Sequence, residues 1–413
     1  MRVLHVLHTS LPVIAGYTIR SDYIVKHQAE HGMRPAVVTS AQQGSGDTLK
    51  EEIGGISYWR TREPSGKKLP LVRELSLVRA LEARVEDAIR EFQPDVVHAH
   101  SPMLVGLPAL AAARRFGLPL VYEVRDLWEN ASVDRGKFAE DSVPYKIAAG
   151  LETVVYKYAD ATVTICESLK NAVAPRVRST DALYVVGNGV DSDKFAPREA
   201  PPGAWERFGL AGKRLIGYVG TFQPYEGLQT LIAAIGDIAR EIPDAHVVIT
   251  GAGGQEMELK AFARERGVES KVTFTGRVPH DEVFNIYAMA SLLVYPRIRT
   301  RTTALTTPLK PLEAMSMARP VMVSDVPAMG ELVRYGETGF VFKAGDSADL
   351  TRRCVEALKD PERLDRVGKN AREWILKERQ WPTLLSRYPA IYEQAIAARR
   401  GRGKSPAGEA RAA

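Results

Sequence analysis

The residues with the clearest chemical potential gather in one stretch, residues 306–326, which reads TTPLKPLEAMSMARPVMVSDV. Thr306, Thr307 and Lys310 come at or just before the start of a segment whose apolar spacing predicts a helix. The first N–H groups of a helix are unpaired and its dipole is positive at that end, so such a helix start attracts anions. The functional interpretation is a phosphate site, and the alternative is a solvated basic loop. Spacing alone favours neither.

Glu313 bears on that choice, because the residues around it are apolar. A carboxylate in such surroundings is costly unless it is paired or receives hydroxyl donors. The vicinal hydroxyls of a ribose would be suitable donors, whereas the competing interpretation is an ion pair with Lys310 three residues earlier. More positive charge comes just upstream, from Arg297, Arg299 and Arg301.

Two glycine-rich turns give a weaker signal of the same kind. The stretch YVGTFQPYEGLQ places Gly220 and Thr221 after a β-branched run and Gly227 before a helical pattern, and TGAGGQ repeats the arrangement with Gly251. In open parallel sheets ligands bind outside the carboxyl ends of the strands, and glycine lets the backbone approach a ligand closely. Because such turns are also ordinary connections, they are supporting evidence only.

The elements that must position these residues alternate between short β-branched runs and helical patterns, which is typical of parallel sheets covered by helices. The alternation restarts after a Pro-, Gly- and charge-rich stretch near residues 192–213. We therefore predict an α/β fold with two doubly wound units, residues 1–195 and 196–381. A final helix at about 382–398 is expected to pack back on the first unit, ahead of a disordered tail at 399–413.

Composition limits the class of protein. The chain has 413 residues, 45% hydrophobic and 26% charged, and no apolar run approaches the ~18 residues of a membrane-spanning helix. Two cysteines far apart predict neither a disulfide framework nor a zinc site, so we expect a reducing cytoplasm. The net charge of +6 favours anionic partners such as nucleotides, phosphorylated substrates or acidic lipid surfaces. The apolar stripe of LVRELSLVRALEARVEDAIREF would suit membrane docking, but core packing is the favoured interpretation.

The order of these motifs resembles glycosyltransferase family 4. The segment KPLEAMSMARPVMVSDV, followed by ELVRYGETGFVFKAGDSADLTRRCVEAL, is similar to the donor-nucleotide signature of that family. NGVDSDKF, YVGTFQPYEGLQTLI and VTFTGRVPHDEV also resemble family segments in order, and the resemblance covers nearly the whole chain. It implies the GT-B fold, in which two Rossmann-like domains face each other across a cleft and the second holds the nucleotide-sugar donor.

The resemblance also implies roles for individual residues in the second domain. Glu313 matches the glutamate that binds the donor ribose. Gly276 and Arg277 correspond to the nucleobase pocket, and Thr306 and Thr307 to the diphosphate-binding turn.

This sequence departs from the family pattern at three places. Leu305 stands where the family usually has the first of two glutamates. Gln223 and Glu226 occupy the region of a usual Arg and Lys, so Lys310, assisted by Arg297, Arg299 or Arg301, is our candidate for the lost positive charge. Arg125 stands where many members have an active-site histidine; it cannot act as a base near neutral pH but can hold a phosphate or carboxylate.

In the first domain, Gly16 and Tyr17 are expected in a loop that approaches the diphosphate or acceptor. His100, at the end of a strand, is the expected sugar-facing group, with a buried structural histidine as the alternative. The candidates for contacting the acceptor are Arg20, Asp126 and Glu129; the alternatives are a surface position for Arg20 and helix capping for the two acids. The predicted catalytic residues are thus His100, Arg125, Lys310 and Glu313.

The predicted function is retaining glycosyl transfer from a UDP- or GDP-sugar to a glycan or lipid-linked acceptor. RDLWE and TTPLKPLEAM resemble a branch associated with bacterial surface polysaccharide and exopolysaccharide assembly, and HTSLPVIAGYTIRS resembles members that accompany exosortase systems. We expect no metal or other cofactor, because the positive residues can substitute for a cation, and no nucleic-acid partner. We expect a cytoplasmic protein with peripheral contact at the inner face of the plasma membrane as a further option.

Two other functions remain open from sequence. One is a nucleotide-sugar epimerase, which shares the two-domain plan but needs no acceptor. The other is a binding protein that has lost catalysis, an idea motivated by Leu305 and Arg125.

Overall fold

The computed structural model describes residues 1–403, except 14, 45–47, 65–69 and 205. The chain forms two compact units, one of Met1–Gly187 with the residues from Leu385 onward, the other of Asn188–Leu384. The sequence placed these boundaries at 195 and 381. The last helix, α16 (Tyr388–Gly403), belongs to the first unit and packs against its strands β6 and β7. It continues through 399–403, where we expected disorder; residues 404–413 lie outside the described residues.

The first unit is built on an eight-stranded sheet in the order β3-β4-β2-β1-β5-β6-β7-β8. Its strands are β1 (Arg2–Leu7), β2 (Arg34–Thr39), β3 (Lys50–Ile53), β4 (Ile56–Arg60), β5 (Val96–His100), β6 (Leu120–Val124), β7 (Ala161–Thr164) and β8 (Leu183–Val185). The pairing is parallel except between β3 and β4, an edge hairpin that the sequence reading missed. Every residue of β5, β6 and β7 is buried, as expected of strands covered on both faces.

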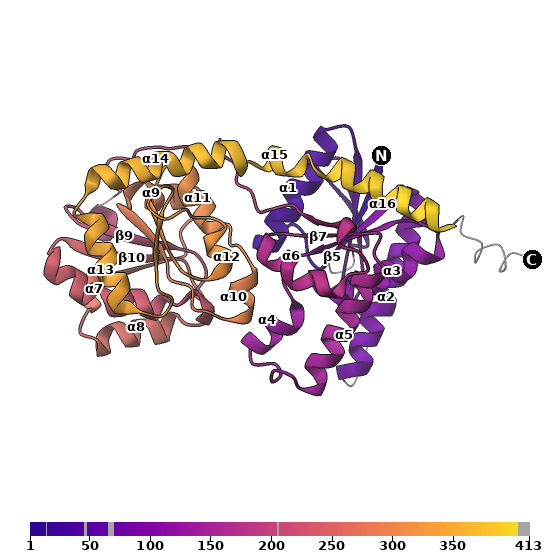
Figure 1. Ribbon diagram of the computed structural model, residues 1–413, viewed down its shortest axis with the longest axis horizontal. Helices are drawn as coiled ribbons and strands as arrows, with labels where there is room; N and C mark the ends of the chain where they lie inside the picture. Colours follow the sequence, from indigo (N-terminus) through magenta and orange to yellow (C-terminus); the bar gives the residue numbers. More distant parts are fainter. Residues whose placement is uncertain (14, 45–47, 65–69, 205, 404–413) are drawn as a thin grey trace, which may run out of the picture. The chain divides into compact units, whose positions relative to one another are not determined.

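Helices cover this sheet (Figure 1). Besides α16 they are α1 (Gly16–Glu30), α2 (Pro70–Phe92), α3 (Met103–Arg115), α4 (Trp128–Asp134), α5 (Val143–Tyr158) and α6 (Glu167–Val173), with short 3-10 turns at Ala41–Gln43, Ala174–Arg176 and Thr180–Ala182. The stripe proposed for membrane docking on α2 is divided: Leu81 and Val85 are buried in the core, whereas Leu75 is exposed.

The second unit is a six-stranded, all-parallel sheet in the order β11-β10-β9-β12-β13-β14. Its strands are β9 (Arg214–Val219), β10 (Ala245–Thr250), β11 (Val272–Gly276), β12 (Leu292–Tyr295), β13 (Val321–Ser324) and β14 (Phe340–Phe342). Its order turns outward in both directions from the β9–β12 pair, and such a switch point is where doubly wound sheets bind ligands.

The helices of the second unit lie around this sheet (Figure 1). They are α7 (Leu228–Glu241), α8 (Glu256–Glu265), α9 (His280–Met289), α10 (Arg301–Leu305), α11 (Lys310–Ser316), α12 (Pro327–Gly330), α13 (Ser347–Leu358) and α14 (Pro361–Glu378), with 3-10 turns at Glu206–Phe208, Pro224–Glu226 and Glu269–Lys271. The short helix α15 (Trp381–Leu385) contains the boundary at which the chain returns to the first unit. Among the described residues of the chain, no helix combines the length and apolar character that crossing a membrane requires.

Candidate functional site

The Lys310 side chain crosses the carboxyl end of β9. Its Nζ lies 2.9 Å from the Tyr218 hydroxyl and 2.9 Å from Oε1 of Glu226. A Cβ placed on Gly220 would fall 2.3 Å from Cε of Lys310, so a larger residue here would displace the lysine side chain from its present position. The Lys310 side chain is 20% exposed, so part of it faces solvent.

Glu226 is buried and joins two cations. Besides Lys310, its carboxylate accepts hydrogen bonds from Arg297, at 3.2 Å from Nη2 and 3.4 Å from Nε. Burial alone would raise the pKa of Glu226, but Arg297 and Lys310 outweigh it and lower the pKa to about 2. Burial, with Arg297 nearby, lowers the pKa of Lys310. Two cations share one carboxylate, so this Arg297–Glu226–Lys310 cluster keeps one positive charge in excess.

Glu313 lies one turn into α11 and is half-buried. Its Oε2 accepts a hydrogen bond of 2.9 Å from the Tyr287 hydroxyl of α9. From sequence, Lys310 was the alternative ion-pair partner for Glu313. In the structure, Lys310 pairs with Glu226. Tyr287 is fully buried, and burial followed by the Glu313 charge raises the pKa of its hydroxyl. Tyr287 therefore stays protonated and orients the Glu313 carboxylate.

The turn before α11 is held from several sides. Arg297 Nη1 donates to the Thr306 carbonyl at 3.2 Å, and Asn188 Nδ2 donates to the Thr307 carbonyl at 2.8 Å. The Thr306 hydroxyl donates to the Thr302 carbonyl, so it closes α10. The expected loop thus contains a helix, and Thr306 caps its end while Lys310 begins the next helix.

The upstream arginines divide between two environments. Arg297 belongs to the cluster, whereas Arg299 is exposed and contacts Asp325. Arg301 is the exposed first residue of α10, and Leu305, where the family has an acid, is its last. Of the three cations that the sequence proposed as helpers of Lys310, Arg297 is the one placed beside it through Glu226.

Three glycines line up where neighbouring strands end. The Gly220 N–H donates to the Thr250 carbonyl, and the Gly251 N–H donates to the Gly276 carbonyl. All three have positive φ, and a Cβ on Gly251 would fall 1.8 Å from the Gly220 oxygen. The ends of β9, β10 and β11 are therefore packed backbone against backbone. Thr221 and Arg277 follow them and are exposed.

In the first unit, the predicted polar residues converge on Glu123 of β6, which is fully buried. Arg20 Nε and Arg125 Nε donate to its Oε1 at 2.9 and 2.8 Å, and the Tyr388 hydroxyl of α16 donates to Oε2. Burial opposes ionisation, but the two arginines hold the pKa of Glu123 well below its usual range. Arg20 also donates to the carbonyls of Val186 and Gly187. Arg20 is thus neither on the surface nor an acceptor contact, because its guanidinium is buried and committed to holding this unit together.

Arg125 is also largely committed within the unit. It donates to the Tyr17 carbonyl, to Ser21 and to Nδ1 of His100. Its guanidinium lies 4.2 Å from the centre of the Tyr17 ring. The side chain is 8% exposed, so the structure gives it an internal positioning role.

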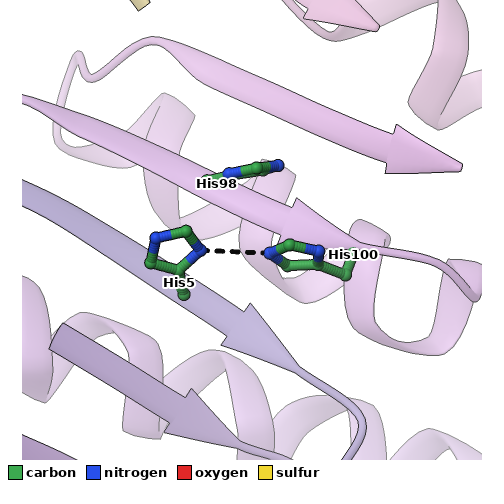
Figure 2. A group of neighbouring side chains, drawn as sticks. All are labelled: His5, His98 and His100. Atoms are coloured by element: carbon green, nitrogen blue, oxygen red, sulfur yellow. Dashed lines mark hydrogen bonds between the residues drawn. The ribbon is translucent and has the colours of Figure 1, made fainter. Parts of the chain in front are cut away.

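His100 is fully buried in a group with His5 and His98, from strands β1 and β5 (Figure 2). Arginine can only donate, so the 2.7 Å contact with Arg125 makes Nδ1 of His100 an acceptor. Its Nε2 then donates to Nδ1 of His5 at 3.1 Å, and Nε2 of His5 donates to Gln28 at 2.9 Å. Burial lowers the pKa of all three histidines, that of His5 to about 3. The prediction of a sugar-facing His100 is wrong, and the alternative of a buried structural histidine is correct.

These histidines do not fit a metal ion. The His98 and His100 rings are stacked, with centroids 4.2 Å apart and planes at 26°. Nitrogen lone pairs lie in the ring planes, so stacked rings direct them side by side rather than towards a common point. The hydrogen bond between His5 and His100 also occupies one nitrogen of each ring.

The remaining first-unit candidates are distributed differently. Gly16 and Tyr17 open helix α1, where we expected a loop. Glu129 is 1% exposed and pairs with Arg176 at 2.7 Å, so it does not face an acceptor. Asp126 is half-buried, and burial raises its pKa. Asp126 therefore remains the candidate for acceptor contact in this unit.

Two partners of the site were not identified from sequence, Tyr218 and Tyr287. In the sequence nothing distinguishes these two tyrosines from core aromatic residues, because each contacts a residue on another element. Glu226 did carry a signal: it is an acid where the family resemblance called for a cation.

Comparison with known proteins shows relatives of both units. Residues 15–189 match the model of the glycosyl transferase 4-like domain, and residues 206–374 match that of glycosyl transferases group 1. Sulfoquinovosyl transferase of Arabidopsis thaliana is 26% identical over 367 residues, covering 87% of this chain and 67% of the relative. A GDP-mannose-dependent phosphatidylinositol monomannoside mannosyltransferase of Mycolicibacterium smegmatis is 30% identical over 229 residues, or 54% of this chain and 60% of the relative.

Solved structures share the fold at low identity. Sucrose-phosphate synthase from Thermosynechococcus elongatus has a TM-score of 0.77 at 18% identity, covering 96% of this chain and 100% of its own. WaaG, a glycosyltransferase involved in lipopolysaccharide biosynthesis, has a TM-score of 0.69 at 17% identity, covering 94% and 99%. With both units built as Rossmann-like parallel sheets and the two family models covering most of the chain, this protein is a glycosyltransferase of the group 1 (GT4) family with the GT-B fold.

Proposed function

We propose that the enzyme transfers a sugar, with retention of configuration, from a nucleotide-diphosphate sugar to a glycan or lipid-linked acceptor. The observation that carries this proposal is the Arg297–Glu226–Lys310 cluster, which holds one excess positive charge at the ends of β9 and β12. Glu313 follows one turn later with its carboxylate oriented by Tyr287. A cation and a carboxylate about one helical turn apart match a diphosphate and its adjoining ribose.

In this proposal Lys310 supplies most of the charge stabilisation. Negative charge builds on the leaving diphosphate as its bond to the sugar breaks, and a preorganised cation at that position lowers the barrier. Glu226 and Tyr218 fix the ammonium group, so little reorganisation is needed when the charge develops. The leaving phosphate itself can take the proton of the acceptor hydroxyl, so the absence of a basic histidine at position 125 does not prevent the reaction.

Glu313 binds the ribose hydroxyls, and the nucleotide approaches the backbone at Gly276, which has open space where a Cβ would lie. The glutamate missing at Leu305 is not replaced by another acid in α10. We propose that Arg297 and Lys310 meet the diphosphate charge without a metal ion.

Two finer proposals concern the substrates. Solved relatives include one bound to UDP-glucose, and a curated relative is named for GDP-mannose, so a uridine or guanosine diphosphate sugar is the donor class we propose. The resemblance of RDLWE and HTSLPVIAGYTIRS to the exopolysaccharide and exosortase-associated branch supports a role in bacterial exopolysaccharide assembly.

Thermal unfolding with a panel of nucleoside diphosphates tests the donor proposal. A ligand that binds only the folded state adds about 2.7 kcal/mol at 100 times its dissociation constant. The correct diphosphate should stabilise the wild-type protein and lose that effect in Lys310→Ala and Glu313→Ala. The matched control is Lys369→Ala, which removes an exposed helical ion pair with Asp365. If both site variants keep the full stabilisation, the site assignment is wrong.

Turnover separates transfer from the alternatives. Release of nucleoside diphosphate that requires an added acceptor identifies a transferase, whereas an epimerase would convert the donor without one. A protein that binds the diphosphate but releases none with any acceptor would be a binding protein.

A further inference from the structure

Helix α5 carries an unusual share of the exposed apolar surface. Among the described residues, twelve large hydrophobic side chains are exposed, and five of them belong to this one helix of 16 residues. They are Val143, Ile147, Leu151, Val154 and Tyr158, exposed by 37 to 70%. Isolated exposed hydrophobic residues are normal, but a contiguous group marks an interaction surface.

The five side chains form one stripe. At 3.6 residues per turn, their positions fall within an arc of about 80° around the helix axis. The opposite face holds the helix to the unit through buried residues, among them Ala148, Glu152, Val155 and Tyr156. Folding therefore uses one face of α5, and the apolar stripe on its other face stays exposed among the residues that the structure describes.

The exposed charges on the helix itself are basic. The exposed charged residues of α5 are Lys146 and Lys157, while its acid, Glu152, is buried against Tyr122 and the Met103 N–H. At the C-terminal end, Arg114 lies 5.7 Å from the Tyr158 ring. Burial and the cations Arg399 and Arg402 of α16 lower the pKa of Arg114, whereas Asp160, which pairs with Arg402, raises it.

This pattern indicates which partner fits. A second copy packed on the same stripe would bring its lysines towards Lys146 and Lys157, and like charges would oppose that pairing. The acids Glu140 and Asp141 precede the helix at its N-terminal end, away from the basic end. An apolar stripe bordered by lysine and arginine is the arrangement of helices that lie in a membrane interface, where anionic headgroups meet the cations.

We propose that α5 docks on an anionic lipid surface, with Ile147, Leu151 and Val154 at the headgroup–acyl boundary and Lys146 and Lys157 on lipid phosphates. The helix lies along the surface and does not span the bilayer. This surface involves none of the donor-site residues, so its test is independent of the test of the proposed donor.

Vesicle flotation with the full-length protein tests the proposal. The protein should float with phosphatidylcholine vesicles that contain phosphatidylglycerol and much less with phosphatidylcholine alone. Ile147→Glu with Leu151→Glu should weaken binding by about tenfold or more, because each removes a large apolar group from the interface and adds a charge that the headgroups repel. Lys146→Glu with Lys157→Glu should abolish the preference for anionic vesicles.

The matched control is Met257→Glu, which changes an exposed hydrophobic residue on α8 and should bind as the wild type does. Circular dichroism and nucleoside diphosphate stabilisation should stay unchanged in all variants, which shows that they fold. Two results would overturn the proposal: equal flotation of the wild type and the Ile147/Leu151 variant, or a wild-type dimer in light scattering that this variant dissociates without any vesicle binding.

Discussion

The Glu226 carboxylate has two roles: it holds two cations in place, and it competes with a phosphate for them. Replacing Glu226 by glutamine separates these roles. The side chain is 3% exposed and its pKa falls from 4.5 to about 2. That shift corresponds to roughly 3 kcal/mol of folding free energy at neutral pH. Breaking a buried ion pair from one side costs a similar amount. We therefore expect Glu226→Gln to lower the free energy of unfolding by about 3 kcal/mol at pH 7.

The pH dependence gives a second check on the same change. Because the folded pKa of Glu226 is depressed, its stabilisation is complete above about pH 4.5 and is lost as the pH falls towards 2. The difference between the wild type and Glu226→Gln in urea unfolding should shrink over that window. The control Glu241→Gln removes an exposed acid that pairs with Lys359, and it should change stability little.

Ligand binding should move in the opposite direction. Without Glu226, Arg297 and Lys310 present one more unit of net positive charge, worth ~3 kcal/mol at 5 Å in an effective dielectric of 20 before screening. Calorimetry should show the nucleoside diphosphate binding about tenfold or more tightly to Glu226→Gln than to the wild type. Turnover should fall, because Lys310 loses the partner that orients it. An unchanged or weaker affinity in the variant would refute the claim that the diphosphate meets this cluster.

Three other outcomes are expected. Gly251→Ala should reduce stability by about 2 kcal/mol or more in urea unfolding and impair nucleotide binding, since its Cβ would overlap the Gly220 oxygen, whereas Gly254→Ala, with open space around it, should be mild. The pKa of His5 is lowered to about 3 in the folded state, so as the pH falls below 6.5 the unfolded state takes up a proton first. The free energy of unfolding should therefore fall by roughly 2 kcal/mol from this group between pH 7 and pH 5. A flat profile of unfolding free energy over that range would contradict a neutral His5. Turnover should persist in excess EDTA, because the proposal assigns the diphosphate charge to Lys310 and Arg297; full loss restored by Mg²⁺ would show that a metal is needed.

The fold was predictable because its signals are local. Alternating β-branched and amphipathic segments indicated both parallel sheets, and each pattern depends on residues close in the chain. The β3–β4 hairpin was missed because KEEI is short and charged, as suits an edge strand. Helix α10 was missed because RTTAL is only five residues long and is stabilised by the Thr300–Thr303 cap.

The site was predictable only where its residues are neighbours in sequence. Lys310 and Glu313 could be proposed from their spacing and the helix start. The Lys310–Glu226 contact joins positions 84 residues apart, and no sequence pattern gives that pairing. Residue type likewise could not reveal that Arg20 and Arg125 are buried, because their burial depends on Glu123, which lies 103 residues beyond Arg20.

A crystal structure with the nucleoside diphosphate that stabilises the protein most would test the central claim directly. We predict a diphosphate oxygen within hydrogen-bond distance of Lys310 Nζ and a ribose hydroxyl on the Glu313 carboxylate. A diphosphate bound elsewhere, with Lys310 still held by Glu226 and Tyr218 and Glu313 making no contact with the ligand, would contradict it.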